Sequence, residues 1–190
     1  MPNRVVVLLS GTGTLLQALI DAQRDQVLNA EVVGVVSDRM DAPGLSRADA
    51  AGIPSTVVVF RPGGDRAAWD AELTRAVADF SADLVVSAGF MKLLGPAFLA
   101  EYAGRAINSH PALLPAFPGI HAVRDALAAG VKVTGATVFW IDQGVDSGKI
   151  IAQEPVRVAA DDTATSLHER IKIVERKMLV DAVNGFRVER

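Results

Sequence analysis

The sequence predicts an α/β fold, with a doubly wound, mostly parallel sheet and an antiparallel extension near the C-terminus. Apolar, β-branched runs of strand length alternate with helical patterns along the 190 residues. The earlier runs are apolar on both faces, which is typical of central parallel strands covered by helices. The last third changes to a clearer alternation of apolar and polar residues, which favours antiparallel pairing. Together these three observations predict a Rossmann-like architecture.

The individual elements follow from these patterns in chain order. The predicted strands are 5–9, 32–37, 56–60, 84–88, 106–109, 134–141 and 150–158. The predicted helices are 14–24, 45–51, 66–80, 96–102, 123–129 and 163–184. A glycine-rich loop at 144–148 joins the last two strands, so we expect that pair to be antiparallel and to extend the sheet edge.

Composition and charge narrow the classes of protein. Half of the residues are apolar and 22% are charged, with a net charge of −3. The charge argues against a protein that binds nucleic acid by neutralising many phosphates. The absence of cysteine excludes a disulfide framework, a thiolate nucleophile and a Cys-ligated zinc. With no signal segment or membrane span expected, the sequence predicts a cytoplasmic protein without a membrane partner.

A glycine turn follows the first predicted strand. Gly11 and Gly13 allow a tight turn into a helix, whose N-terminus presents free N–H groups to an anion. The dinucleotide fingerprint requires a third glycine where this chain has Leu16. The turn therefore favours a monophosphate ligand over NAD, although Asp38 resembles the acid that binds a dinucleotide ribose. A glycine turn without any ligand remains the alternative.

The end of the predicted strand 106–109 carries the residues most suited to chemistry. Asn108 and His110 are two apart and so project to one face, while Ser109 points to the other. An amide and an imidazole there could stabilise the oxyanion of acyl transfer to an amine, and the histidine could move a proton. The alternative is a polar strand end that satisfies local backbone groups. His121 and His168 are expected to be ordinary surface or capping residues.

Two carboxylates, Asp142 and Asp146, lie in the loop after the predicted strand 134–141. One of them is expected to pair with His110 and to favour its charged form. Residue patterns alone do not choose between the two, and acids between glycines are also common in simple turns. No cluster of side chains has metal-ligand spacing, so no metal is expected.

Four motifs in fixed order carry a resemblance to a known family. They are Ser10-Gly11-x-Gly13, Ala88-Gly89-Phe90-Met91-Lys92-Leu93-Leu94, Asn108-x-His110-Pro111-x-Leu113-Leu114-Pro115 and Asp146-x-Gly148. The combination resembles the phosphoribosylglycinamide formyltransferases over nearly the whole chain. The resemblance implies one domain over 1–190, with a mononucleotide-binding half at about 1–105 and a folate-binding and catalytic half at about 106–190. It also implies formyl transfer from 10-formyltetrahydrofolate to phosphoribosylglycinamide in purine biosynthesis.

By position, the resemblance assigns roles to individual residues. It implies catalysis by Asn108, His110 and Asp146, with Asp146 chosen over Asp142 by analogy alone. It implies substrate binding by Gly11, Thr12, Gly13, Thr14, Leu15, Lys172 and Glu175. It implies folate binding by Arg66, Met91, Lys92, Leu93, Leu94, Asn108, Ile141, Asp142, Gln143, Gly144 and Val145.

Some assignments have alternatives or departures. Lys172 and Glu175 lie three apart on one predicted helix, so an ordinary surface salt bridge between them is the alternative. Thr14-Leu15 stands where relatives often have Ser-Asn, and Lys149 and Arg176 replace a frequent proline and histidine.

Three other functions compete with this interpretation. Methionyl-tRNA formyltransferase and formyltetrahydrofolate hydrolase share the Asn-x-His and Asp elements, but each adds a domain that we do not expect here. A non-catalytic nucleotide-binding module would keep only the glycine turn. We therefore expect small-molecule partners, no nucleic acid, and either a monomer or a homodimer.

Overall fold

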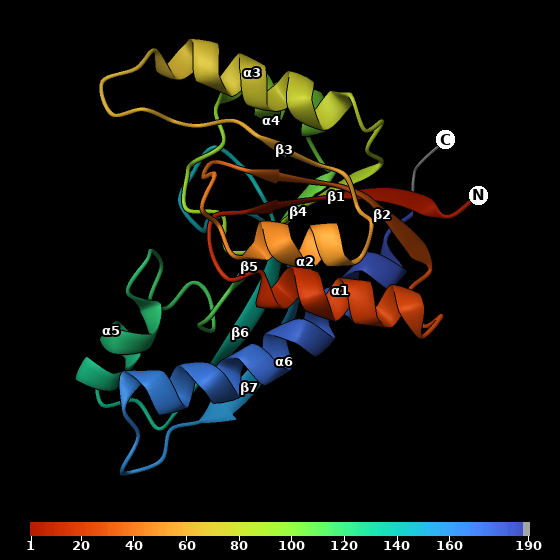
Figure 1. The fold of residues 1–190 in the computed structure, drawn as a ribbon. Helices are drawn as coiled ribbons and strands as arrows, with labels where there is room; N and C mark the ends of the chain where they lie inside the picture. Colours follow the sequence, from red (N-terminus) through yellow and green to blue (C-terminus); the bar gives the residue numbers. More distant parts are fainter. Residues whose placement is uncertain (188–190) are drawn as a thin grey trace.

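The computed structural model describes residues 1–187 and contains one seven-stranded sheet in the order β3-β2-β1-β4-β5-β6-β7 (Figure 1). Strands β1 to β5 pair in parallel, and β6 is antiparallel to both β5 and β7. The predicted doubly wound sheet with an antiparallel extension is therefore confirmed.

The elements lie close to their predicted positions. The strands are β1 Asn3–Leu9, β2 Ala30–Ser37, β3 Ser55–Val57, β4 Leu84–Ser87, β5 Ala106–His110, β6 Val133–Trp140 and β7 Ile150–Arg157. The helices are α1 Thr14–Arg24, α2 Gly44–Ala50, α3 Arg66–Ala78, α4 Pro96–Tyr102, α5 Ala122–Ala128 and α6 Ala164–Gly185.

Strand β3 ends earlier than the predicted 56–60, and a tertiary contact accounts for the difference. The Val58 N–H still bonds to the Ser37 carbonyl at 2.8 Å. The Val58 carbonyl, however, accepts a hydrogen bond from the Trp69 indole at 2.9 Å. The Phe60 ring then packs edge-on against Trp69, with 5.3 Å between ring centroids. Segment 58–60 therefore leaves the sheet to pack against α3.

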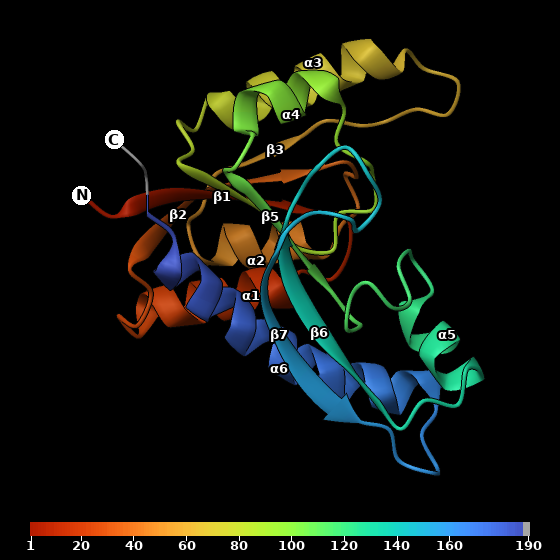
Figure 2. The ribbon, with the colours of Figure 1, turned by 180° about the vertical axis from the view of Figure 1, so that it is seen from behind.

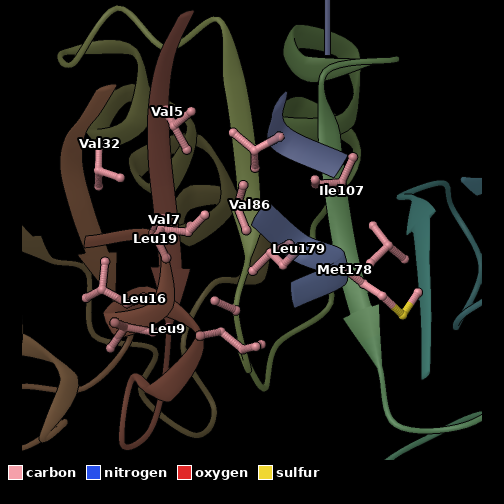
Figure 3. Packing of buried hydrophobic residues seen from close by; sticks show 14 of the residues in the cluster. Val5, Val7, Leu9, Leu16, Leu19, Val32, Val86, Ile107, Met178 and Leu179 are labelled. Atoms are coloured by element: carbon pink, nitrogen blue, oxygen red, sulfur yellow. The ribbon is translucent and has the colours of Figure 1, made fainter. Parts of the chain in front are cut away.

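Helices cover both faces of the sheet and bury two separate apolar clusters. Alternate residues of β1 supply both clusters, because successive side chains of a strand point to opposite faces. Val5, Val7 and Leu9 pack with α1 and α6, whereas Val6 and Leu8 pack with α3 and α4. Figure 2 shows the two helical layers from behind, and Figure 3 shows Leu16, Leu19 and Leu179 of the first cluster.

The strand order reverses at β1, which has β2 on one side and β4 on the other. Open α/β sheets bind ligands at such a point, beyond the carboxyl ends of the strands. The segments that follow β1 and β4 are joined there. The Ser10 N–H bonds to the Gly89 carbonyl at 3.2 Å, and the Met91 N–H bonds to Ser10 Oγ at 2.8 Å. The predicted phosphate loop and the predicted folate segment are therefore neighbours.

Helix α6 is the long element that links both ends of the sheet. It begins with a capping box in which Thr163 and Ser166 each bond to the other's backbone N–H. It packs against α1, β6 and β7 (Figure 2) and brings its middle turns close to β5. Within residues 1–187, no helix is both long and apolar enough to span a bilayer.

Candidate active site

His110 is the last residue of β5, and both of its ring nitrogens face oxygen atoms. Nδ1 lies 3.3 Å from Oδ2 of Asp146, and both side chains are largely buried. Nε2 lies 2.8 Å from the carbonyl oxygen of Phe117. A carbonyl oxygen only accepts, so Nε2 carries the hydrogen in that bond. The carboxylate of Asp146 therefore orients the ring through Nδ1, and the carbonyl of Phe117 covers Nε2.

Asp146, and not Asp142, is the acid that the fold brings to His110. The loop after β6 starts at the far end of β5, where the Ile141 N–H bonds to the Ala106 carbonyl at 2.9 Å. It then folds back along the strand. Asp146 has a φ of 52° and accepts a bond from the Gly119 N–H at 2.7 Å.

Asp142 serves a different purpose, because it holds its own loop together. Its Oδ1 accepts hydrogen bonds from the Gly144 N–H at 2.9 Å and from Ser147 Oγ at 2.8 Å. The carboxylate is thus engaged within the turn. The choice that the residue pattern left open is decided by these two sets of contacts.

Asn108 is half-buried in the middle of β5 and shares a strand face with His110. Its backbone pairs with Ser87 on one side and Phe139 on the other. Its side-chain amide makes no hydrogen bond within the described part of the chain. The amide is therefore available as a donor to an oxygen that becomes negatively charged beside His110.

The predicted folate segment 91–94 is held at both of its ends. Met91 is tied to Ser10, as described above. Beyond Leu94, the buried Asp70 carboxyl accepts hydrogen bonds from the Gly95 N–H at 2.7 Å and the Ala97 N–H at 2.8 Å. Met91 and Leu93 stay exposed between these anchors, which leaves an apolar surface for a ligand.

Charged and aromatic side chains surround the same segment. The Arg66 guanidinium donates to the Leu93 carbonyl and lies 4.6 Å above the Trp69 ring. Lys92 Nζ lies 3.6 Å from Oδ2 of the buried Asp38. Leu94 and Ile141 pack against one apolar cluster, which brings the two predicted folate segments together. In the second segment, Val145 is exposed like Met91.

In the glycine turn at residues 11–13, two carbonyl groups accept hydrogen bonds from other parts of the chain. The Gly11 carbonyl accepts from the Gly44 N–H at 3.0 Å, and the Thr12 carbonyl accepts from Arg47 Nε at 2.8 Å. Gly13 has a φ of 69°, and a Cβ there would lie 2.7 Å from the Cα of Gly44. The first turn of α1 thus leaves its N–H groups open to an anion. The Leu15 side chain is buried, so it could contribute only its backbone.

Lys172 and Glu175 do not pair with each other on α6. Lys172 Nζ donates to Glu169 at 2.7 Å. Glu175 is only 5% exposed and accepts a hydrogen bond from Ser109 Oγ at 2.7 Å. The alternative of a surface salt bridge between the two is therefore wrong.

The environment of Glu175 perturbs its acidity. Burial raises the pKa of Glu175, and this effect outweighs the opposing Ser109 hydrogen bond and the charges of His110, Lys172 and Arg176. The folded protein therefore holds this proton to a higher pH than the unfolded chain does.

This raised pKa leads to a prediction about stability. A proton held more tightly by the folded state stabilises it below the unfolded pKa, and that contribution is lost as the pH rises through the folded pKa. The free energy of unfolding is thus expected to decline as the pH rises from about the ordinary value of 4.5. In Glu175→Gln, which cannot titrate, the free energy of unfolding measured with denaturant should decline less steeply between about pH 5 and 8. Equal slopes in the two proteins would contradict the prediction.

Two histidines that the residue pattern assigned to ordinary roles lie beside Lys172. His121 and His168 line a cavity of about 360 Å³ together with Lys172 and Pro111, the residue after His110. Burial, and then the charge of Lys172, lowers the pKa of His168. His168 precedes Lys172 by four residues, so helical spacing was the available signal for this pair. Within residues 1–187 no three His, Asp or Glu side chains form a group that could hold a metal ion.

Comparisons with known proteins agree with this geometry. A family model described as formyl transferase matches residues 3–183. Phosphoribosylglycinamide formyltransferase of Mycobacterium tuberculosis (strain ATCC 25618 / H37Rv) is 53% identical over 182 residues, or 96% of this chain and 84% of that protein.

Solved structures resemble the chain as well. The crystal structure of glycinamide ribonucleotide transformylase 1 from Symbiobacterium toebii has a TM-score of 0.92 and 42% identity, covering 96% of this chain and 86% of that one. A formyltetrahydrofolate deformylase from Pseudomonas syringae has a TM-score of 0.88 and 31% identity, covering 96% of this chain and 60% of that one. The fold, the site and these similarities together establish that the chain belongs to the formyl transferase family.

Proposed function

We propose that this chain transfers the formyl group of 10-formyltetrahydrofolate to the amine of 5'-phosphoribosylglycinamide. The observation that carries the proposal is the contact of 3.3 Å between His110 Nδ1 and Asp146, on the strand where the amide of Asn108 has no hydrogen-bond partner among residues 1–187. Asp146 directly follows the predicted folate segment 141–145 in the chain, and Asn108 pairs with Ser87, the last residue of β4, from which the chain continues to the predicted folate segment 91–94. The similarity to phosphoribosylglycinamide formyltransferase over 96% of the chain supports the same reaction.

The trio suits direct attack by the substrate amine. The amine nitrogen forms a bond to the formyl carbon, and the carbonyl oxygen becomes an oxyanion that Asn108 and His110 stabilise as donors. The nitrogen then loses a proton. The C–N bond to the folate breaks, and the departing folate nitrogen takes up a proton. His110, oriented by Asp146, is the group that moves protons between these nitrogens.

His110 must first be released from Phe117. Its Nε2 is bonded to the Phe117 carbonyl, so the reacting atoms reach this nitrogen only when that carbonyl withdraws. Phe117 has a φ of 55°, a left-handed conformation that is uncommon for a bulky residue. A small shift of the loop between Pro111 and His121 would free the nitrogen.

The two substrates would occupy opposite sides of the trio. The N–H groups of residues 12–15 would hold the phosphate, with Lys172 adding positive charge. Glu175 would meet the glycinamide end. Backbone groups of 91–94 and 141–145 would hold the pterin of the folate, and Arg66 would lie near the folate. The proposed partners are thus two small molecules, the ribonucleotide and the folate.

A formyl-transfer assay with both substrates tests the proposal. Spectrophotometric turnover that requires both 10-formyltetrahydrofolate and the ribonucleotide, and that fails in Asn108→Ala, is the expected result. Folate consumption without the ribonucleotide would instead indicate a deformylase, the activity named for the Pseudomonas syringae structure. Tight nucleotide binding without any folate consumption would indicate a binding module.

A further inference from the structure

Ser109 lies between Asn108 and His110 but faces the opposite side of β5. Its hydroxyl donates to Glu175 Oε1 at 2.7 Å, across the interface between β5 and α6. Both residues are buried, at 9% and 5% exposure. The strand that carries the proposed catalytic amide and imidazole is therefore tied directly to a carboxyl group on α6.

This hydrogen bond is the single one that the Glu175 side chain makes within residues 1–187. The nearby basic groups do not replace it. Lys172 Nζ is bonded to Glu169, and Arg176 Nε has no hydrogen-bond partner in the same range. Without Ser109, a glutamate with three rotatable side-chain bonds would lose its one fixed contact. The Ser109 hydroxyl thus selects the direction in which the carboxyl points.

A simple packing role for Ser109 makes a different prediction. Its neighbour Ile107 faces the same side of the strand and lies in the apolar cluster with α6. If Ser109 only filled space there, alanine would serve nearly as well. A hydroxyl in this position is useful for the polar contact that it makes, because a buried carboxyl group left without a hydrogen-bond partner costs free energy.

We propose that Ser109 is a positioning residue that holds Oε1 of Glu175 and so presents the other oxygen, Oε2, to the ribonucleotide substrate. This inference rests on the proposed function, in which Glu175 meets the glycinamide end. Because Ser109 acts through Glu175 and not on the formyl group, it sets the affinity for the ribonucleotide. The rate of formyl transfer and the affinity for folate depend on other residues.

Steady-state kinetics of Ser109→Ala test the inference. The expected result is a KM for the ribonucleotide about tenfold higher, because a misplaced Glu175 would lose about one hydrogen bond to the ribonucleotide, with kcat and the KM for folate within about twofold. Ser109→Thr keeps a hydroxyl and should restore most of the affinity. An unchanged KM in Ser109→Ala, or a loss confined to kcat, would overturn the inference.

Thr134→Val is the matched control for loss of a buried hydroxyl. Thr134 lies in β6 opposite Val156, is 1% exposed, and its hydroxyl has no hydrogen-bond partner within residues 1–187. This variant should keep the KM of the wild type. If it raised the KM as much as Ser109→Ala does, the effect would be structural and the inference would be wrong.

The pH profile adds a measurement that reports on the ionisation of Glu175 as well as on its position. The Ser109 hydrogen bond lowers the pKa of Glu175, so its removal should move the acid limb of kcat/KM for the ribonucleotide to higher pH. An unmoved limb would contradict the inference. If Ser109→Ala does not fold, Ser109→Cys keeps the volume but is a weak donor, and it should raise the KM in the same way. Wild-type protein that does not turn over both substrates would refute the proposed function itself.

Discussion

Replacing His110 with alanine is expected to lower kcat for formyl transfer by about 10²- to 10⁴-fold, the usual contribution of a general acid–base residue. The imidazole ring of His110 is the group in the trio whose two nitrogens allow it to take a proton from one atom and give it to another. Its Nδ1 lies 3.3 Å from Asp146, and the alanine variant loses that pair altogether. Stopped-flow single-turnover measurements would separate this loss in the chemical step from any effect on binding.

The partner of the histidine provides the companion variant. Asp146→Asn keeps the shape of the side chain, and the Asn carbonyl can still accept from the Gly119 N–H, which lies 2.7 Å from Oδ2 in the wild type. The substitution removes the negative charge that faces His110, so kcat should fall, as we expect for His110→Ala. Folding is checked by circular dichroism and thermal unfolding for both variants. Wild-type turnover in either folded variant would refute the assigned roles.

Asn108→Ala is expected to lower kcat by about 10²- to 10³-fold while leaving the KM for the ribonucleotide nearly unchanged. The amide makes no hydrogen bond within residues 1–187, so its removal should not disturb the free protein. The loss arises only when the formyl oxygen becomes negative and one of its two donors is missing. Comparison of kcat and KM for the purified variant with those of the wild type measures this effect.

The contrast with Ser109→Ala sharpens the prediction for Asn108. The two residues are adjacent on β5 but face opposite sides of the sheet. One variant should lose kcat and the other should lose ribonucleotide affinity. If Asn108→Ala instead raised the KM and left kcat within about twofold, the oxyanion role would be wrong.

Local patterns predicted most of the secondary structure. α1 and α4 begin and end at the predicted residues, because a glycine precedes each helix and the apolar residues follow a helical period. The predicted end of β3 was wrong, because the Val58 carbonyl accepts a hydrogen bond from the Trp69 indole and does not pair within the sheet. That bond depends on the position of α3, which no pattern within residues 56–60 reports.

For the candidate site too, local patterns predicted some features and missed others. Alternation along a strand correctly placed Ser109 on the face opposite to Asn108 and His110. It could not say what Ser109 would meet, since Glu175 is 66 residues further along the chain. The side-by-side position of Lys172 and Glu175 suggested a salt bridge, but Lys172 pairs with Glu169 on the same helix, and the packing of α6 against β5 turns Glu175 toward Ser109.

The sequence by itself determined the fold class, the order of the elements, and the face of β5 that carries the amide and the imidazole. These depend on periodicity and turn residues, which are properties of neighbouring positions. The family resemblance already implied Asp146, but only the tertiary structure shows that Asp146 meets His110, that the Phe117 carbonyl covers Nε2, and that Ser109 holds Glu175. Each of these contacts depends on how a loop or a helix is placed against another strand. Their positions are set by the packing of the whole sheet, so no local pattern contains them.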